Sequence, residues 1–290
     1  MLTSLAAAVI LAGCGPAVSA PSSVVDAPTR VAETAAGPVG YRELGTGSPL
    51  LLITGLGASM DDWAPSFVAT LATHHRVVVL DNAGVGKTGD LASPLGIIEM
   101  ARETSALIST LRLGPSALLG WSMGGMVAQA LAVLHPSQVS RIVLAATQPG
   151  TGHALPIPAA AAAAVASSDP AKRVSVLFPR SAPAAERDYL LSILRYPHFY
   201  QAPRAAVAAQ NAAVEQWMAG RDPAGSRFDQ VRLPVMVAGG TEDQLDPSSN
   251  DRMLAGEVPG ASLVLYSGAG HAFLFQDSAR FLPSVQRFLQ

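Results

Sequence analysis

The sequence predicts an α/β domain built on a mostly parallel central sheet with helices on both faces. Short apolar runs with the length of buried strands recur along the chain; they cover residues 50–54, 76–80, 141–146, 233–240 and 263–266. Apolar residues at helical spacing lie between them, as in residues 97–111. Because parallel strands are joined by crossover helices, this alternation predicts a parallel sheet that binds its ligand at the carboxyl ends of the strands.

Length and composition exclude several classes of protein. The 290 residues are enough for one large α/β domain or two small ones. Charged residues make up 14% of the chain, the formal net charge is −2 and no basic run occurs, so no nucleic-acid partner is expected. Cys14 is the only cysteine, which excludes an internal disulfide and a cysteine-based metal cluster.

The N-terminus resembles a bacterial lipoprotein signal. Residues 5–12 form an apolar run that is too short to span a bilayer, which takes about 20 residues. Residues 11–13 and Cys14 resemble the lipobox that is cut before a lipid-modified cysteine. We therefore predict a signal peptide over residues 1–13, lipidation at Cys14 and an exported protein anchored to the bacterial cell membrane. No Lys or Arg precedes the run, so a secreted or cytoplasmic protein is the alternative if the signal does not function.

A flexible tether is predicted between this signal and the folded domain. Residues 14–37 are rich in Ala, Pro, Ser, Val and Thr, a composition that buries too little apolar surface to offset the entropy of ordering. The domain is predicted to start at residue 38, because residues 39–43 alternate like a strand and residues 45–49 contain turn residues. A hairpin is expected to open it.

A Gly-x-Ser-x-Gly sequence over residues 120–124 follows an apolar run and precedes an Ala-rich helical pattern. A serine hydroxyl is a weak nucleophile, so it must project from a tight strand-to-helix turn towards a base. Gly120 and Gly124 lack a Cβ and let two chain segments pass closely at that turn. Ser122 is therefore the predicted nucleophile.

An acid and a histidine follow Ser122 in the chain. Asp243 lies three residues after Gly240, where a predicted strand ends, and His271 lies on a glycine-rich loop after the last predicted strand. A short loop can aim a carboxylate at a histidine and hold the imidazole in the tautomer that accepts the serine proton. We therefore expect Asp243 and His271 to meet Ser122 at one edge of the sheet.

Three other acids lie near Asp243, and each is expected to have another role. Glu242 should point to the other side of the loop. Asp246 precedes Pro247 and is placed to start a helix. Asp251 should lie on that helix and face water.

These motifs resemble those of the α/β-hydrolase superfamily, and the resemblance covers roughly residues 39–290. It is carried by Gly-x-Ser-x-Gly, by Gly-x-x-Asp-x-x-x-Pro over residues 240–247 and by the late histidine. The resemblance implies the α/β-hydrolase fold with an inserted helical cap. It also implies a triad of Ser122, Asp243 and His271, with no metal and no organic cofactor.

An oxyanion hole is implied by the same resemblance. In the family, the loop after the strand at residues 50–54 and the residue after the nucleophile each supply one backbone N–H. The corresponding residues here are Leu56 and Met123. Thr54 stands where the family often has histidine. Because the oxyanion donor is a backbone N–H, this replacement weakens the resemblance more than the chemistry. Ala83 replaces an arginine of the family's turn after the next strand.

Residues 148–232 are predicted to form the cap. They contain several prolines and helical patterns over residues 184–194 and 205–218, with no clear strand. His153 is expected to be a loop histidine without a catalytic role. Six aromatic residues either line an apolar pocket or pack the cap on the core: they are Phe178, Tyr189, Tyr196, Phe199, Tyr200 and Trp217.

The predicted function is carboxylic ester hydrolysis of a small or medium apolar substrate. Core segments 38–147 and 233–290 would supply the triad, and the cap would supply an apolar pocket. Perhydrolysis, C–C bond hydrolysis and acyl transfer use the same triad and are alternatives. A non-catalytic surface binding lipoprotein that keeps the fold is another. The oligomeric state is not predicted.

Overall fold

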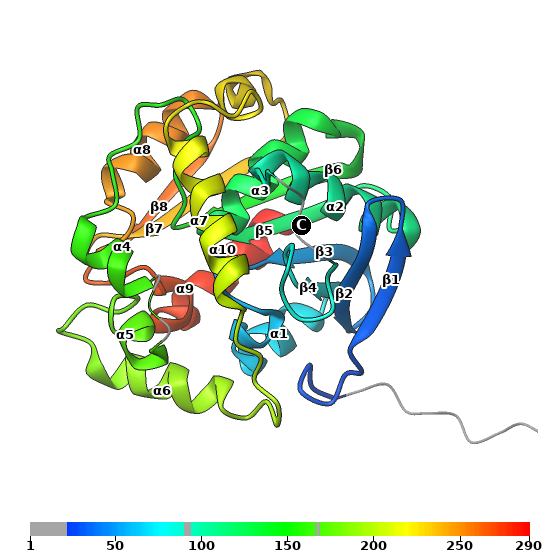
Figure 1. Ribbon diagram of the computed structural model, residues 1–290, viewed down its shortest axis with the longest axis horizontal. Helices are drawn as coiled ribbons and strands as arrows, with labels where there is room; N and C mark the ends of the chain where they lie inside the picture. The colour runs from blue at the N-terminus through cyan, green and yellow to red at the C-terminus, as the bar shows by residue number, and fades with distance from the viewer. Residues whose placement is uncertain (1–21, 90–93, 166, 168) are drawn as a thin grey trace, which may run out of the picture.

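The computed structural model describes residues 22–89, 94–165, 167 and 169–290. Its centre is a sheet of eight strands in the order β1-β2-β4-β3-β5-β6-β7-β8 (Figure 1). Strands β3 to β8 run parallel, whereas β2 is antiparallel to both of its neighbours. The predicted mostly parallel sheet is therefore confirmed. The strands are β1 (Arg30–Thr34), β2 (Gly37–Leu44), β3 (Ser48–Ile53), β4 (His75–Leu80), β5 (Ser116–Trp121), β6 (Val139–Ala145), β7 (Val235–Gly240) and β8 (Ser262–Tyr266).

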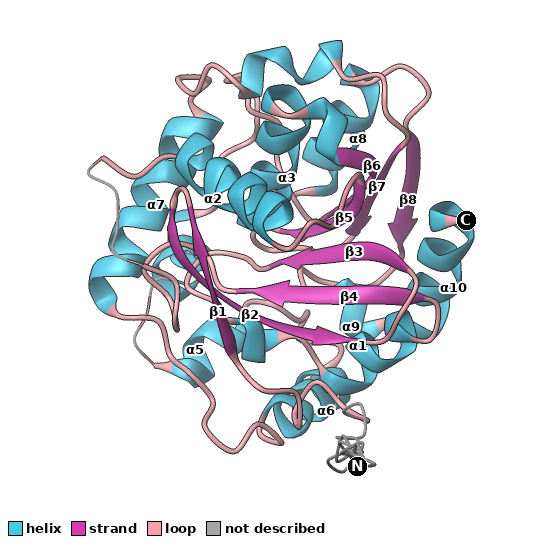
Figure 2. Ribbon diagram, turned by 90° about the vertical axis from the view of Figure 1, so that its right-hand side faces the viewer, coloured by secondary structure: helices cyan, strands magenta, loops and turns pink. Residues whose placement is uncertain are grey.

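Two apolar layers enclose the sheet, because successive residues of a strand point to opposite faces. In β3, Leu51 and Ile53 belong to one layer, and Leu50 and Leu52 belong to the other. Helices cover both faces (Figure 2): α2 (Ile97–Thr110), α3 (Met123–Leu134) and α8 (Ser248–Glu257) lie on the first, and α1 (Pro65–Ala72), α9 (Phe273–Gln276) and α10 (Ser278–Leu289) lie on the second. Helices thus cover both faces of the sheet, as the continuous apolar runs of the strands require.

The N-terminal edge of the sheet differs from the prediction. β1 pairs with β2 along its whole length, and Val24 and Ala32 are buried. The tether predicted over residues 14–37 is therefore wrong for residues 24–37. An edge strand needs only one buried face and gains backbone hydrogen bonds from its neighbour, which the composition of the segment does not reveal.

The opening hairpin also lies earlier than predicted. It joins β1 and β2, so the folded part of the chain begins before residue 38, the predicted domain start. The predicted turn at residues 45–49 leads instead from β2 to β3. These two strands do not pair, because β4 lies between them.

A helical insertion lies between β6 and β7, and its described residues contain no strand. Its helices are α4 (Ala159–Val165), α5 (Pro170–Ser175), α6 (Pro183–Ile193), α7 (Arg204–Met218) and the 3-10 helix η3 (Gly225–Gln230). Buried aromatic side chains attach this insertion to the core. Tyr189 donates a hydrogen bond to the Asp62 carbonyl at 3.0 Å. Tyr196 donates one to the Trp63 carbonyl at 2.9 Å.

Short 3-10 helices complete the chain. The helix η2 (Pro136–Gln138) links α3 to β6, and η1 (Met60–Asp62) follows the loop after β3. Ser59 caps η1 in a capping box with Asp62. The capping box orients the Asp62 carboxylate, which is important for the pocket described below.

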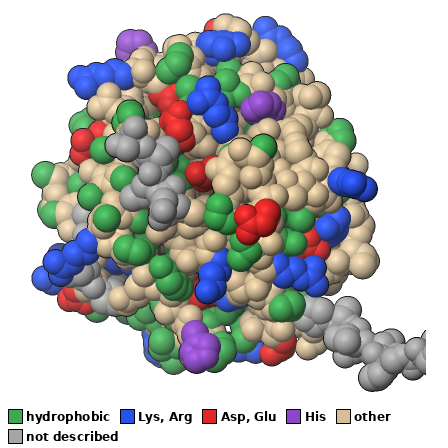
Figure 3. Space-filling model, turned by 45° about the vertical axis from the view of Figure 1, so that its right-hand side comes forward, with side chains coloured by type: hydrophobic (Ala, Val, Ile, Leu, Met, Phe, Trp, Pro, Cys, Tyr) green, Lys and Arg blue, Asp and Glu red, His purple; other side chains and the backbone are tan. Residues whose placement is uncertain are grey.

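The described surface carries scattered charges. On the face in Figure 3, Lys and Arg side chains are interspersed with Asp and Glu. Within the described ranges, no helix has both the length and the apolar character needed to cross a bilayer. The predicted signal peptide and Cys14 lie outside the described residues, so that prediction stays a prediction.

Candidate active site

Ser122 lies on a sharp, strained turn between β5 and α3. Its φ of 57° and ψ of −125° belong to a region that side-chain-bearing residues rarely adopt. A Cβ at Gly120 would collide with the Gly124 carbonyl, and one at Gly124 would collide with the Ile53 carbonyl. The strand, the helix and β3 therefore approach as closely as the sequence motif requires, and the turn exposes the Ser122 side chain to the pocket.

The predicted base and acid are in direct contact. Nδ1 of His271 lies 2.8 Å from Oδ2 of Asp243, and both side chains are almost fully buried. The other Asp243 oxygen accepts the backbone N–H groups of Leu245 and Asp246 at 2.7 and 2.8 Å. Burial lowers the pKa of His271, but the charge and the hydrogen bond of Asp243 outweigh it, so the pKa is raised above its usual value.

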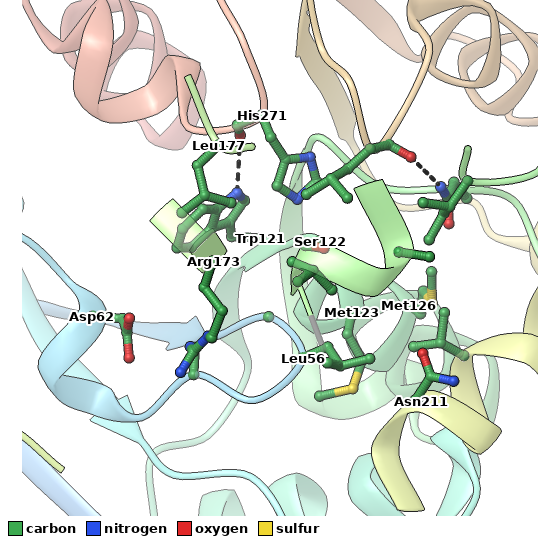
Figure 4. Close-up of a pocket in the computed structure, with 18 of the residues that line it drawn as sticks. Leu56, Asp62, Trp121, Ser122, Met123, Met126, Arg173, Leu177, Asn211 and His271 are labelled. Atoms are coloured by element: carbon green, nitrogen blue, oxygen red, sulfur yellow. Dashed lines mark hydrogen bonds between the residues drawn. The ribbon is translucent and has the colours of Figure 1, made fainter. Parts of the chain in front are cut away.

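Ser122 and His271 line the same pocket (Figure 4). Within the described residues, Ser122 Oγ has no hydrogen-bond partner, so the predicted acid and base are in contact while the predicted nucleophile is unbonded. The hydrogen bond between a nucleophile and its base is often long without substrate and shortens when substrate binds. The structure thus places Ser122 and His271 on one cavity, after β5 and β8, and Asp243, after β7, is hydrogen-bonded to the histidine without lining that cavity.

Among the neighbouring acids, only Asp243 contacts the histidine. Glu242 lies on the outer side of the loop, where its carboxylate accepts a hydrogen bond from Ser181 at 3.2 Å. Asp246 is buried and accepts a hydrogen bond from Asn250 at 2.9 Å. Burial and the negative charge of Asp243 raise the pKa of Asp246 to about 7.

Asp251 contradicts its prediction. It lies on α8, as expected, but it is completely buried rather than facing water. Neither carboxylate oxygen has a hydrogen-bond partner among the described residues. Burial, together with the charges of Asp246 and Asp243, raises its pKa well above the usual value. The helical pattern of α8 is weak, which is why the sequence did not indicate the face on which Asp251 lies.

The two predicted oxyanion donors lie on the same pocket, close to Ser122. Leu56 and Met123 both line it (Figure 4). Leu56 N–H donates to no described residue, and Met123 N–H is the first of α3 and so has no acceptor within the helix. Gly55 brings the loop close, because a Cβ at position 55 would lie 3.1 Å from Ser122 Cβ. The two N–H groups are therefore available to a ligand beside Ser122.

The rest of the pocket is mainly apolar. Its wall includes Leu56, Met126, Ile157, Leu177, Val214 and Leu245. None of the six cap aromatics lines it; Phe178, Tyr189, Tyr196 and Trp217 are buried and pack the cap on the core, whereas Tyr200 is exposed. His153 is exposed in a loop and lies outside this pocket.

One part of the wall is polar, and sequence analysis did not identify it. Asp62 from η1 and Arg173 from α5 line the pocket together (Figure 4). Burial raises the pKa of Asp62 to about 6, although the charge of Arg173 opposes that shift. No sequence signal marks Arg173, because α5 has only six residues and its place over the core depends on the tertiary fold.

Comparison with known proteins identifies the family. The sequence model of the α/β hydrolase fold matches residues 48–278, a span that includes Ser122, Asp243 and His271. The chain belongs to the α/β-hydrolase fold family. The predicted fold class and the predicted superfamily are both confirmed.

Individual relatives match to different extents. The protein named non-heme bromoperoxidase BpoC, of Mycobacterium tuberculosis, is 40% identical over 109 residues. The match covers 37% of this chain and only 41% of BpoC. The poly(3-hydroxyalkanoate) depolymerase of Ectopseudomonas oleovorans is 28% identical over 247 residues, covering 84% of each chain. An α/β hydrolase fold protein from Chitinophaga pinensis superposes with a TM-score of 0.81 at 24% identity, covering 92% of this chain and 98% of that one. This last likeness concerns the fold alone.

Proposed function

We propose that this α/β hydrolase cleaves carboxylic esters with a triad of Ser122, His271 and Asp243. The observation that carries the proposal is the 2.8 Å contact of Asp243 with His271, which lines the same pocket as Ser122 on its strained turn. A histidine held at Nδ1 by a carboxylate leaves Nε2 available as a base. This arrangement supports acyl transfer to a serine.

The reaction proceeds in two halves. Ser122 Oγ attacks the ester carbonyl carbon, and its proton passes to His271 Nε2. The N–H groups of Leu56 and Met123 bind the oxyanion that forms. The intermediate then expels the alcohol, which takes the proton from His271. In the second half, His271 takes a proton from water, the resulting hydroxide attacks the acyl-enzyme, and Ser122 recovers its proton as the acid leaves.

The substrate is a small or medium ester with an apolar acyl or alkyl group. Six apolar residues of the wall support this choice: Leu56, Met126, Ile157, Leu177, Val214 and Leu245. A relative named poly(3-hydroxyalkanoate) depolymerase supports an ester as the substrate class. Asp62 and Arg173 carry opposite charges, so together they favour a neutral substrate over a charged one. We expect kcat/KM to be higher for neutral esters than for charged esters of matched length.

The protein is further proposed to act at the bacterial cell surface, attached by a lipid at Cys14. The support is the resemblance of residues 11–14 to a lipobox after a short apolar run. An exported hydrolase with an apolar pocket would meet apolar esters from outside the cell.

Fluorophosphonate labelling followed by an ester panel tests the catalytic proposal. We expect the purified protein to be labelled at Ser122 and to hydrolyse neutral p-nitrophenyl esters. Ser122→Ala should abolish labelling and lower turnover by several orders of magnitude, since only the oxyanion and binding contributions remain. A folded protein that takes no label and turns over no ester would instead be the non-catalytic binding protein. Turnover that needs peroxide or an acceptor alcohol would indicate perhydrolysis or acyl transfer.

A further inference from the structure

Gly57 follows the oxyanion donor Leu56 and is held by the cap at both of its backbone groups. Its N–H donates a hydrogen bond to Gln210 Oε1 at 2.8 Å. Its carbonyl accepts one from Arg173 Nη2 at 3.0 Å. Gln210 lies on α7 and Arg173 on α5, so two separate cap helices hold the same residue of a core loop.

The backbone of Gly57 explains why this contact is close. Its φ is +66°, and a Cβ there would lie 3.2 Å from Val207 of α7. Val207 and Gln210 are three residues apart and therefore share one face of the helix. Glycine allows both the left-handed conformation and the approach of α7 to the loop.

Gln210 is itself fixed in a single orientation. Its side chain is fully buried, and its Nε2 donates a hydrogen bond to the Ala83 carbonyl at 3.1 Å. Only one placement of the amide puts an oxygen beside Gly57 N–H and a nitrogen beside the Ala83 carbonyl. Gln210 thus joins two core loops, the one after β3 and the one after β4, through a buried cap side chain.

These bonds determine the direction of the Leu56 N–H. Residues 55–58 form a turn in which Ala58 N–H donates to the Gly55 carbonyl at 3.3 Å. Leu56 and Gly57 occupy its two central positions, and the positive φ of Gly57 is what the third position of a type II turn requires. The peptide planes on both sides of Leu56 are therefore restrained, and the direction of its N–H is restrained with them.

We propose that Gln210 and Arg173 are positioning residues that place the Leu56 N–H in the oxyanion hole through Gly57. The inference rests on the proposed serine hydrolase function. Gln210 does not line the pocket, whereas Arg173 does, so Gln210 is the residue whose substitution isolates positioning from substrate binding. The cap then completes the catalytic machinery in addition to enclosing the substrate.

Gln210→Met tests this role, since methionine is similar in size and makes neither hydrogen bond. We expect kcat to fall about tenfold to hundredfold with KM within about threefold, because a displaced oxyanion donor affects the transition state more than the ground state. Inhibition by an alkyl boronic acid should weaken by a similar factor. That probe adds Ser122 Oγ to boron and places a boron-bound oxygen in the oxyanion hole.

Tyr196→Phe is the matched control. It removes an equally buried hydrogen bond between cap and core, from Tyr196 to the Trp63 carbonyl, and touches neither Gly57 nor the pocket. We expect its kcat and boronic acid inhibition to stay within about threefold of the wild-type values. Equal losses of kcat in the two variants would overturn the proposal, because both would then report only loosening of the cap.

Gln210→Glu gives a second readout that a general structural role would not produce. A protonated glutamic acid can accept from Gly57 N–H and donate to the Ala83 carbonyl, as glutamine does, whereas the ionised form puts an acceptor against that carbonyl. The ratio of variant to wild-type kcat should therefore rise as pH falls, while the ratio for Gln210→Met stays flat. A ratio for Gln210→Glu that stays flat and well below one down to acidic pH would overturn the proposal, even if Gln210→Met does not fold.

Failure of this inference is distinguishable from failure of the proposed function. If the wild-type protein hydrolyses esters and Ser122→Ala does not, the function stands. Wild-type values of kcat in Gln210→Met would then reject the positioning role alone.

Discussion

The indole N–H of Trp121 donates a hydrogen bond to the backbone carbonyl of His271 at 3.0 Å. Trp121 is the last residue of β5 and directly precedes Ser122, the proposed nucleophile. The strand that leads to Ser122 is thereby bonded to the loop that carries His271, the proposed base. Gln276 also holds this loop, since it accepts from Gly270 N–H and donates to the Gly268 carbonyl. Such support keeps a base on a glycine-rich loop in position.

Asp243→Asn should lower kcat by about 10⁴, because the amide keeps the shape of the carboxylate but favours the wrong histidine tautomer. Glu242→Gln is the matched control, as its carboxylate contacts Ser181 on the exposed side of the loop. We expect the control to stay within about tenfold of wild type. Steady-state kinetics on a p-nitrophenyl ester measure both variants. A larger loss in Glu242→Gln than in Asp243→Asn would reassign the acid.

Activity should fall on the acid side, because His271 acts as a base only when neutral. Burial lowers the pKa of this histidine, but the charge and hydrogen bond of Asp243 raise it above the usual value of 6.5. Protonation as pH decreases through that raised pKa removes the base, so the acid limb of kcat/KM should have its midpoint above pH 6.5. A profile of kcat/KM against pH measures it. A midpoint below 6.5 would contradict the dominance of Asp243.

Asp251→Asn should stabilise the fold at alkaline pH. The pKa of the buried Asp251 is raised in the folded state, so the folded protein binds more protons than the unfolded chain between the two pKa values. Stability is then greatest at low pH and decreases as pH rises through the folded pKa. Asparagine removes this cost, and we expect a gain of about 1–3 kcal/mol at pH 8 that is smaller at pH 5.

Thermal or urea unfolding at the two pH values checks this prediction. Asp26→Asn, at an exposed position, serves as the control and should change stability equally at both pH values. An equal change in Asp251→Asn at pH 5 and pH 8 would mean that ionisation of Asp251 does not affect folding.

Cys14→Ser should release the protein from the membrane fraction of cells that produce it. Each buried CH₂ of an acyl chain contributes about 0.8 kcal/mol to membrane binding, and serine cannot carry the thioether-linked lipid. Fractionation and immunoblotting of both forms measure the effect. An unchanged membrane fraction would remove the lipid anchor from the proposal.

The sequence by itself determined the elements whose signals are local. Ser122 follows from five consecutive residues that must make a strained strand-to-helix turn. Asp243 and His271 follow from their places directly after predicted strands, since the ends of parallel strands meet at one edge of the sheet. The buried strands follow from continuous apolar runs, because both faces of such a sheet are covered.

Only the tertiary structure decided the features that depend on partners distant in the chain. β1 is a strand because β2 lies beside it, and its own composition indicated a tether instead. Asp251 is buried because α8 packs its face against β7 and β8, which the weak pattern of the helix does not predict. Gly57 meets Gln210 across 153 residues of sequence. Such contacts form only when the whole fold brings the loops and the cap together, so no local pattern of residues contains them.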